Sequence, residues 1–169
     1  GFTTIRRERH GKRICIFIIG IAGIAKISKY CFMASNVRRQ LESWLKTIDV
    51  TADSVIDIGG LFMPVKGRTK SWEVNQYDIL DIKKTRNGVV ASEIWDMNHF
   101  VSLYPKEYDV AFILETLNHI WDPVQCFQNI NGFLKPGGLV YSSVHFVFPH
   151  HTGLDCLRYT STGLTKILN

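Results

Sequence analysis

Apolar residues recur along the chain with two different spacings, which predict helices alternating with strands. Short apolar runs at residues 54–58, 77–81, 91–95, 108–114 and 139–148 are typical of buried strands. A helical spacing precedes them, and Asn36 is its predicted N-cap. The apolar positions of this helix are Val37, Leu41, Trp44, Leu45 and Ile48.

Proline, glycine and capping residues punctuate these runs. Residues 61–76 contain Pro64 and Gly67, so we expect a loop there and no long crossover helix. Asp122 followed by Pro123 predicts a helix start, because proline suits the first helical position. The turn at 135–138 ends that helix, and Thr160 caps a last one.

Short apolar strands separated by helical segments favour a parallel sheet that is covered on both faces. We therefore expect an α/β fold, a Rossmann-like doubly wound sheet. Residues 35–169 would form this domain, preceded by a basic and apolar N-terminal segment at 1–34. Ligands of such sheets bind beyond the carboxyl ends of the strands.

Composition narrows the class further. The 169 residues carry a net charge of +5 and are 46% hydrophobic, which excludes wholesale disorder. The four cysteines have no metal-ligand spacing, so we expect reduced thiols, no bound metal and a cytoplasmic location. The apolar run at 14–25 is shorter than the roughly 18–20 residues that span a bilayer. It is compatible with a buried strand and with weak contact to a membrane surface. Basic and aromatic residues are not interleaved as in single-strand nucleic-acid binders, so we expect no nucleic-acid partner.

Glycines or carboxylates follow four of the predicted strands. Gly59 and Gly60 follow the first, Asp81 ends the second, Asp96 follows the third and Glu115 follows the fourth. Glycine lets a ligand approach the backbone, and an acid about 20 residues later suits a ribose diol. Asp57, just before the glycines, can order their loop. The set predicts a nucleoside pocket, although each acid also fits a structural role such as loop capping.

Three segments resemble class I S-adenosylmethionine-dependent methyltransferases, of the methyltransferase type 11 kind. The stretch 55–60 (VIDIGG) is similar to the first motif of that family. Residues 108–120 (YDVAFILETLNHI), followed by 134–138 (LKPGG), resemble its later half. The ending from Phe148 to Leu164 is similar to a subgroup that acts on small molecules. The resemblance covers roughly residues 50–168.

The resemblance implies a role for each matching position, with S-adenosylmethionine as the cofactor. Gly59 and Gly60 would pass under its methionine part, and Asp57 would support that loop or reach the amino group. Asp81 would hold the ribose hydroxyls. The remaining positions are Asp96, which would accept from the adenine amino group, Met97, which would pack on the ring, and Glu115, which would border the methionine end and the substrate entrance.

Two departures from the family pattern leave alternatives open. Leu61 stands where the first motif usually has a further glycine. The family's terminal antiparallel hairpin is missing, so the strand order 3-2-1-4-5 would leave the fifth strand as an apolar edge. Either the run at 14–21 covers this edge, or the protein forms a homodimer through it, or the chain is a truncated copy.

The activity that the resemblance implies is methyl transfer to a small molecule, such as a sugar or a surface-polysaccharide intermediate. A hydroxyl acceptor would need a general base, and the candidates are His145, His150 and His151. Two other hypotheses remain. One is a degenerate, non-catalytic module that acts by association. The other is a nicotinamide-binding Rossmann domain, which fits less well because no G-x-G-x-x-G follows the first strand.

Overall fold

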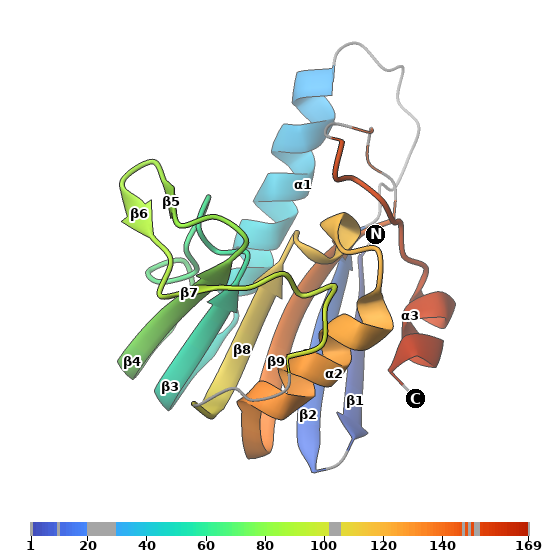
Figure 1. Cartoon of the computed structure of the whole chain (residues 1–169). Helices are drawn as coiled ribbons and strands as arrows, with labels where there is room; N and C mark the ends of the chain where they lie inside the picture. The colour runs from blue at the N-terminus through green and yellow to red at the C-terminus, as the bar shows by residue number, and fades with distance from the viewer. Residues whose placement is uncertain are drawn as a thin grey trace.

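The computed structural model describes residues 2–9, 11–19, 30–101, 106–146, 148, 150 and 153–168. Most of the described chain forms strands and helices, with six strands in succession between the first helix and the 3-10 turn (Figure 1). In order they are β1 (Phe2–Arg9), β2 (Lys12–Ile19), α1 (Tyr30–Leu45), β3 (Asp49–Ile58), β4 (Ser71–Asp81), β5 (Thr85–Arg86), β6 (Val89–Val90), β7 (Glu93–Ile94), β8 (Tyr108–Leu114), the 3-10 turn η1 (Leu117–His119), α2 (Pro123–Phe133), β9 (Leu134–His145) and α3 (Ser161–Ile167).

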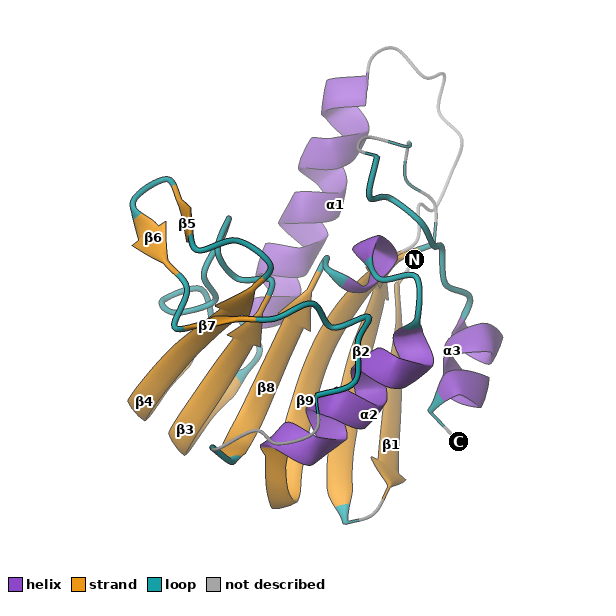
Figure 2. Cartoon of the chain, in the orientation of Figure 1, coloured by secondary structure: helices purple, strands orange, loops and turns teal. Residues whose placement is uncertain are grey.

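Seven strands form one sheet in the order β1-β2-β9-β8-β3-β4-β7, and β5 pairs with β6 in a separate hairpin (Figure 2). All neighbours in the large sheet are parallel except β1 and β2. The five predicted strands correspond to β3, β4, β7, β8 and β9, and their predicted order is confirmed. The expected Rossmann-like α/β fold is therefore the observed one.

Alternating side chains of each strand serve two separate cores. On one face, Val55 and Phe112 join a cluster with Leu41 and Leu45 of α1. On the other face, the neighbouring strand positions pack under α2 and α3 (Figure 1). Helices thus cover both faces, as a doubly wound sheet requires.

The N-terminal hairpin occupies the position beside the fifth strand. β2 pairs in parallel with β9 along Arg13–Ile19, and β1 lies antiparallel on its outer side. Of the three alternatives for the edge of the fifth strand, the structure has the first: the N-terminal run covers it, through residues 13–19 of β2. β9 is paired on both sides, so the expectation of an exposed fifth-strand edge through which a homodimer forms is wrong. Residues 2–19 belong to the same sheet as the domain expected at 35–169.

Several element boundaries differ from those predicted. α1 starts at Tyr30, one and a half turns before the expected cap Asn36. β4 starts at Ser71, because its polar first half extends the pairing with β3 into the expected loop. The strand expected at 91–95 is shortened to β7, and β9 ends at His145. The caps are confirmed where predicted: Asp122 accepts from Gln125 N, and Thr160 accepts from Gly163 N.

The helices and cysteines can be compared with what the composition predicted. Among the helices of the described chain, none has the length and apolar character needed to cross a bilayer. The thiols of Cys15, Cys126 and Cys156 are free, and burial raises the pKa of Cys126.

Candidate functional site

A cavity of about 770 Å³ lies at the carboxyl ends of β3, β4, β7 and β8. This is the end of the sheet where parallel α/β folds bind ligands, and the size is typical of small-molecule sites. All seven residues that the sequence nominated for the cofactor lie in its wall. They are Asp57, Gly59, Gly60, Asp81, Asp96, Met97 and Glu115.

Tight packing surrounds the two glycines at the tip of β3. Gly59 has a φ of +77°, and a Cβ there would lie 2.2 Å from Thr116 Oγ1. A Cβ on Gly60 would lie 2.3 Å from the Asp57 carboxyl group. Both positions therefore require glycine for reasons within the protein itself.

Asp57 faces inward and holds the glycine loop in place. Its Oδ2 accepts hydrogen bonds of 2.7 Å from Val65 N and from the Tyr77 hydroxyl. Burial raises the pKa of this carboxyl to about 6, although the two hydrogen bonds and the charge of Arg68 oppose the rise. Of the two roles expected for Asp57, the observed contacts are those of loop support.

Asp81 and Asp96 present carboxylates at neighbouring strand ends. Asp81 is partly exposed, and its Oδ1 accepts from Lys83 N at 3.1 Å. Asp96 is exposed, and its Oδ1 accepts from the backbone and side-chain nitrogens of Asn98. Asn98 in turn accepts from Trp121 N at 2.9 Å, which fixes the Asp96 loop against the start of α2. In the described chain, Asp81 Oδ2 has no hydrogen bond, so it is available to a ligand.

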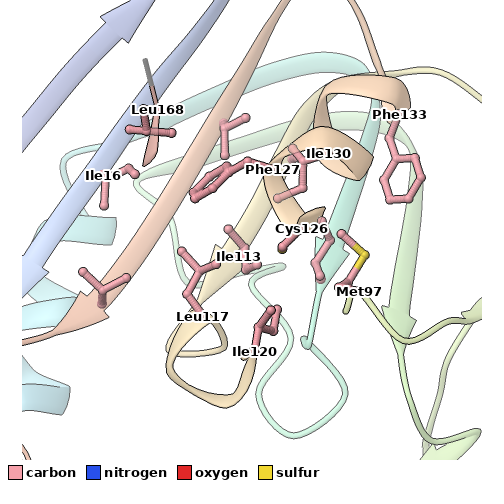
Figure 3. Packing of buried hydrophobic residues seen from close by; sticks show 14 of the residues in the cluster. Ile16, Met97, Ile113, Leu117, Ile120, Cys126, Phe127, Ile130, Phe133 and Leu168 are labelled. Atoms are coloured by element: carbon pink, nitrogen blue, oxygen red, sulfur yellow. The ribbon is translucent and has the colours of Figure 1, made fainter. Parts of the chain in front are cut away.

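Met97 is more enclosed than a residue that only packs on a ligand. Its exposed fraction is 3%, and it lies among buried side chains that include Cys126 and Ile120 (Figure 3). The Met97 carbonyl oxygen accepts from Asn129 Nδ2. Met97 thus anchors the β7–β8 connection against α2 in the core while it contributes to the cavity wall.

Glu115 adopts an uncommon backbone conformation at the tip of β8. Its φ is +52°, which is unfavourable for a side chain with a Cβ. The Glu115 N–H donates to Ser143 Oγ at 2.9 Å, and the carboxylate accepts from Arg38 Nη2 at 3.2 Å. Burial raises the pKa of Glu115, but the hydrogen bond and charge of His145 and the charge of Arg38 outweigh it, so the net pKa is lowered.

The three candidate histidines occupy different places. His145 is buried at the cavity, with Nε2 3.3 Å from Glu115 Oε1 and its ring stacked on Phe148. Its Nδ1 is buried without a hydrogen-bond partner in the described chain. His150 is exposed and is not among the cavity-lining residues. His151 lies outside the described residues.

Sequence reasoning missed several polar residues of this cavity, among them Arg38 and Asn118. Arg38 comes from α1 and reaches Glu115, although nothing in its helical pattern distinguishes it from a solvated arginine. Asn118 follows β8, is fully buried, and its Oδ1 lacks a partner among the described residues. A polar residue inside the apolar run 117–120 was the one sequence signal for Asn118.

Comparison with known proteins gives one family match and several structural matches. The family described as "Methyltransferase domain" matches residues 74–142. Among curated proteins, no sequence matches the chain significantly. Of the solved structures, 26 chains match significantly. One belongs to the complex between the Haloferax volcanii Trm112 methyltransferase activator and a protein described as a methyltransferase. That chain is 16% identical, with 81% of this chain and 72% of that chain covered and a TM-score of 0.55.

Residues 74–142 are thus similar to the methyltransferase domain family, and the structural match shows that the chain shares the fold of the neighbour. The matched segment contains the tips of β4, β7 and β8, which carry Asp81, Asp96 and Glu115.

Proposed function

We propose that the chain transfers a methyl group from S-adenosylmethionine to a small-molecule acceptor at the cavity on the strand tips. One observation carries the proposal. A single cavity gathers the glycine backbone of β3 and the carboxylates at the ends of β4 and β7. Carboxylates at two adjoining strand tips suit a ligand that has hydroxyls at one position and an amino group at the next.

The residues fit the cofactor in three respects. Asp81 has a free carboxylate oxygen for the ribose hydroxyls, and Asp96 is exposed toward the position of the adenine amino group. The Glu115 carboxylate has a lowered pKa, so it is ionised at neutral pH and attracts the positively charged methionine end. Finally, the cavity volume of about 770 Å³ suits one cofactor with a small acceptor beside it.

The protein's part in the reaction is alignment and proton removal. The cofactor supplies an already activated methyl group, so the chain must mainly position the acceptor and exclude water. For a hydroxyl acceptor, such as that of a sugar, His145 is the base that we propose. The contact of its Nε2 with Glu115 would orient the ring and stabilise the imidazolium.

A specific observation also favours the non-catalytic alternative. Arg38 spans from α1 to Glu115 at the end of the cavity where the methyl group would lie, and Leu61 replaces a family glycine. Leu61 lines the cavity, but its side chain is buried in a small cluster with Ile79 and Ala91 and leaves the cavity open. The Arg38–Glu115 ion pair is therefore the observation that supports the non-catalytic alternative. In that alternative the protein keeps the fold and acts by association with a partner protein.

Calorimetric titration of the purified protein distinguishes these functions. We expect S-adenosylmethionine and S-adenosylhomocysteine to bind at about micromolar Kd, near −8 kcal/mol, and NADH not to bind. The absence of binding to both sulfur nucleosides would favour the association module. NADH binding alone would instead identify a nicotinamide domain.

A further inference from the structure

A second, larger groove lies away from the strand tips, between α1 and the three strands β1, β2 and β9. Its volume is about 1200 Å³. α1 packs on this face of the sheet, where Leu41 and Leu45 join a cluster with Phe17 and Phe112. The N-terminal hairpin extends the sheet beyond β9 (Figure 1). The groove shares no lining residue with the strand-tip cavity.

The sheet wall of the groove is built from two rows of paired residues. Arg6, Cys15 and Tyr141 lie opposite one another across β1, β2 and β9. Glu8, Arg13 and Leu139 form the next row, two residues along each strand. Because alternate residues of a strand share a face, both rows face α1 together with Phe17. The sequence pattern R-x-C-x-F in β2 thus places charge at one end of the groove and an apolar surface at the other.

Aromatic rings supply the apolar floor. Phe17 of β2 stacks on Trp44 of α1, with ring centroids 4.7 Å apart and an interplanar angle of 7°. Tyr141 meets the Trp44 ring edge-on at 6.2 Å. Trp44 and Tyr141 are only partly buried, so part of this ring surface remains available for contact. An apolar ligand would gain free energy by covering it.

Positive charge surrounds the floor. Arg6 and Arg13 stand on the sheet wall and Arg39 on the helix wall, and all three are exposed. Within the described chain, neither Arg13 nor Arg39 forms an ion pair, whereas Arg6 donates a hydrogen bond to the Cys15 thiol.

Carboxylates compensate this charge only in part. Glu8 lies opposite Arg13 in the β1–β2 register, and Asp49 is already held by Lys70 and Ser71. Asp49 is fully occupied by these partners, so Glu8 is the one lining carboxylate left for three guanidinium groups. The groove therefore has unsatisfied positive charge beside an apolar floor.

We propose that this groove binds a single small amphiphilic anion. Its phosphate or carboxylate head would lie at the charged end of the groove beside Arg6 and Arg13, which stand in neighbouring rows of the sheet wall. Guanidinium groups bind both anions with paired hydrogen bonds. Its apolar chain or ring would cover Trp44 and Tyr141. The groove is a concave surface between a helix and a sheet, which suits one molecule better than a flat membrane surface. This site is separate from the methyl-transfer site and does not depend on it.

Octyl phosphate, kept below its micelle concentration, is the probe for this proposal, and octyl glucoside is the uncharged comparison. We expect saturable one-to-one binding of octyl phosphate by calorimetry and about tenfold weaker binding of octyl glucoside. Arg6→Gln and Arg13→Gln should each weaken octyl phosphate about tenfold. Lys166→Gln, which removes the same charge from exposed α3, should leave the Kd unchanged.

Three controls make the outcome decisive. The thermal unfolding midpoints of the variants should match that of the unaltered protein, because the substituted side chains are exposed. S-adenosylhomocysteine should not compete with octyl phosphate, and its own Kd, whatever its value, should not change in Arg13→Gln. The proposal is overturned if octyl phosphate fails to bind or binds the arginine variants equally well. Binding only to phosphatidylglycerol vesicles would also overturn it and would indicate a membrane-surface site instead.

Discussion

Substitution of Gly59 by alanine is expected to destabilise the protein by about 3 to 5 kcal/mol, from left-handed strain and overpacking together. The alanine Cβ would lie 2.2 Å from Thr116 Oγ1 and 3.0 Å from Thr116 Cβ. Thr116 cannot easily withdraw, because its hydroxyl donates to the Leu114 carbonyl oxygen at 3.0 Å. The tips of β3 and β8 would therefore be pushed apart, and the cavity between them would lose its shape.

Gly67 provides a matched control for this change. It also has a positive φ, of +82°, but nothing lies within 4 Å of the position of its Cβ. Gly67→Ala should therefore cost only the backbone strain, about 1 to 2 kcal/mol. Adding Thr116→Ala to Gly59→Ala should restore part of the loss, because it removes the two nearest atoms. Chemical denaturation measures all three variants, and equal losses for Gly59→Ala and Gly67→Ala would contradict the close approach.

The buried carboxyl of Asp57 should give the protein a stability that decreases as pH rises. Its pKa in the folded state is raised from 3.8 to about 6 by burial. A carboxyl with a raised folded pKa contributes stability that is fully present below pH 3.8 and is lost as pH rises through about 6. A rise of this size corresponds to about 3 kcal/mol.

Asp57→Asn tests this dependence, because asparagine keeps an oxygen for Val65 N and Tyr77 but does not titrate. The free energy of unfolding of Asp57→Asn, relative to the unaltered protein, should increase by about 3 kcal/mol between about pH 4 and about pH 7. Asp78→Asn is the control of opposite sign. Hydrogen bonds from Gln76 and Tyr108 to Asp78 outweigh its burial and lower its pKa. Asp78 therefore stabilises the fold above the ordinary aspartate range and loses that contribution at lower pH.

If the difference between Asp57→Asn and the unaltered protein does not change with pH, the carboxyl group does not bind its proton more tightly in the folded state. The inward-facing role of Asp57 would then be wrong. A difference that decreases as pH rises would mean instead that Asp57 behaves like Asp78.

The parts of the fold that the sequence predicted are those with local signals. β8 was predicted with its observed bounds because a continuous apolar run fills it from Val110 to Leu114. The start of α2 was predicted because the cap Asp122 and the residue after it act within one turn. The strand-end acids were found because parallel strands place their carboxyl ends along one edge.

The parts that were missed depend on contacts between distant segments. The apolar run of β2 fits a buried strand and a surface segment equally well, and only pairing with β9 decides between them. The first half of β4 is polar, and its apolar and polar residues alternate only weakly. Together with Pro64 and Gly67 upstream, this pattern predicted a loop, and only the pairing with β3 makes the segment a strand. Arg38 reaches the cavity because α1 crosses the sheet near β8, which no spacing within α1 reveals.

A nucleoside is expected to bind across the strand tips, with its ribose held by Asp81. A thermodynamic cycle tests this binding mode. It compares the Kd of S-adenosylhomocysteine with that of an analogue that lacks both ribose hydroxyls, each measured for the unaltered protein and for Asp81→Ala. Asp53→Ala, which removes an exposed carboxylate from the middle of β3, is the control for charge.

We expect Asp81→Ala to weaken S-adenosylhomocysteine about 10- to 100-fold, as for loss of hydrogen bonds to a charged group. The same substitution should leave the affinity for the analogue nearly unchanged, and Asp53→Ala should affect neither ligand. Equal weakening of both ligands by Asp81→Ala, or no weakening of either, would contradict the account.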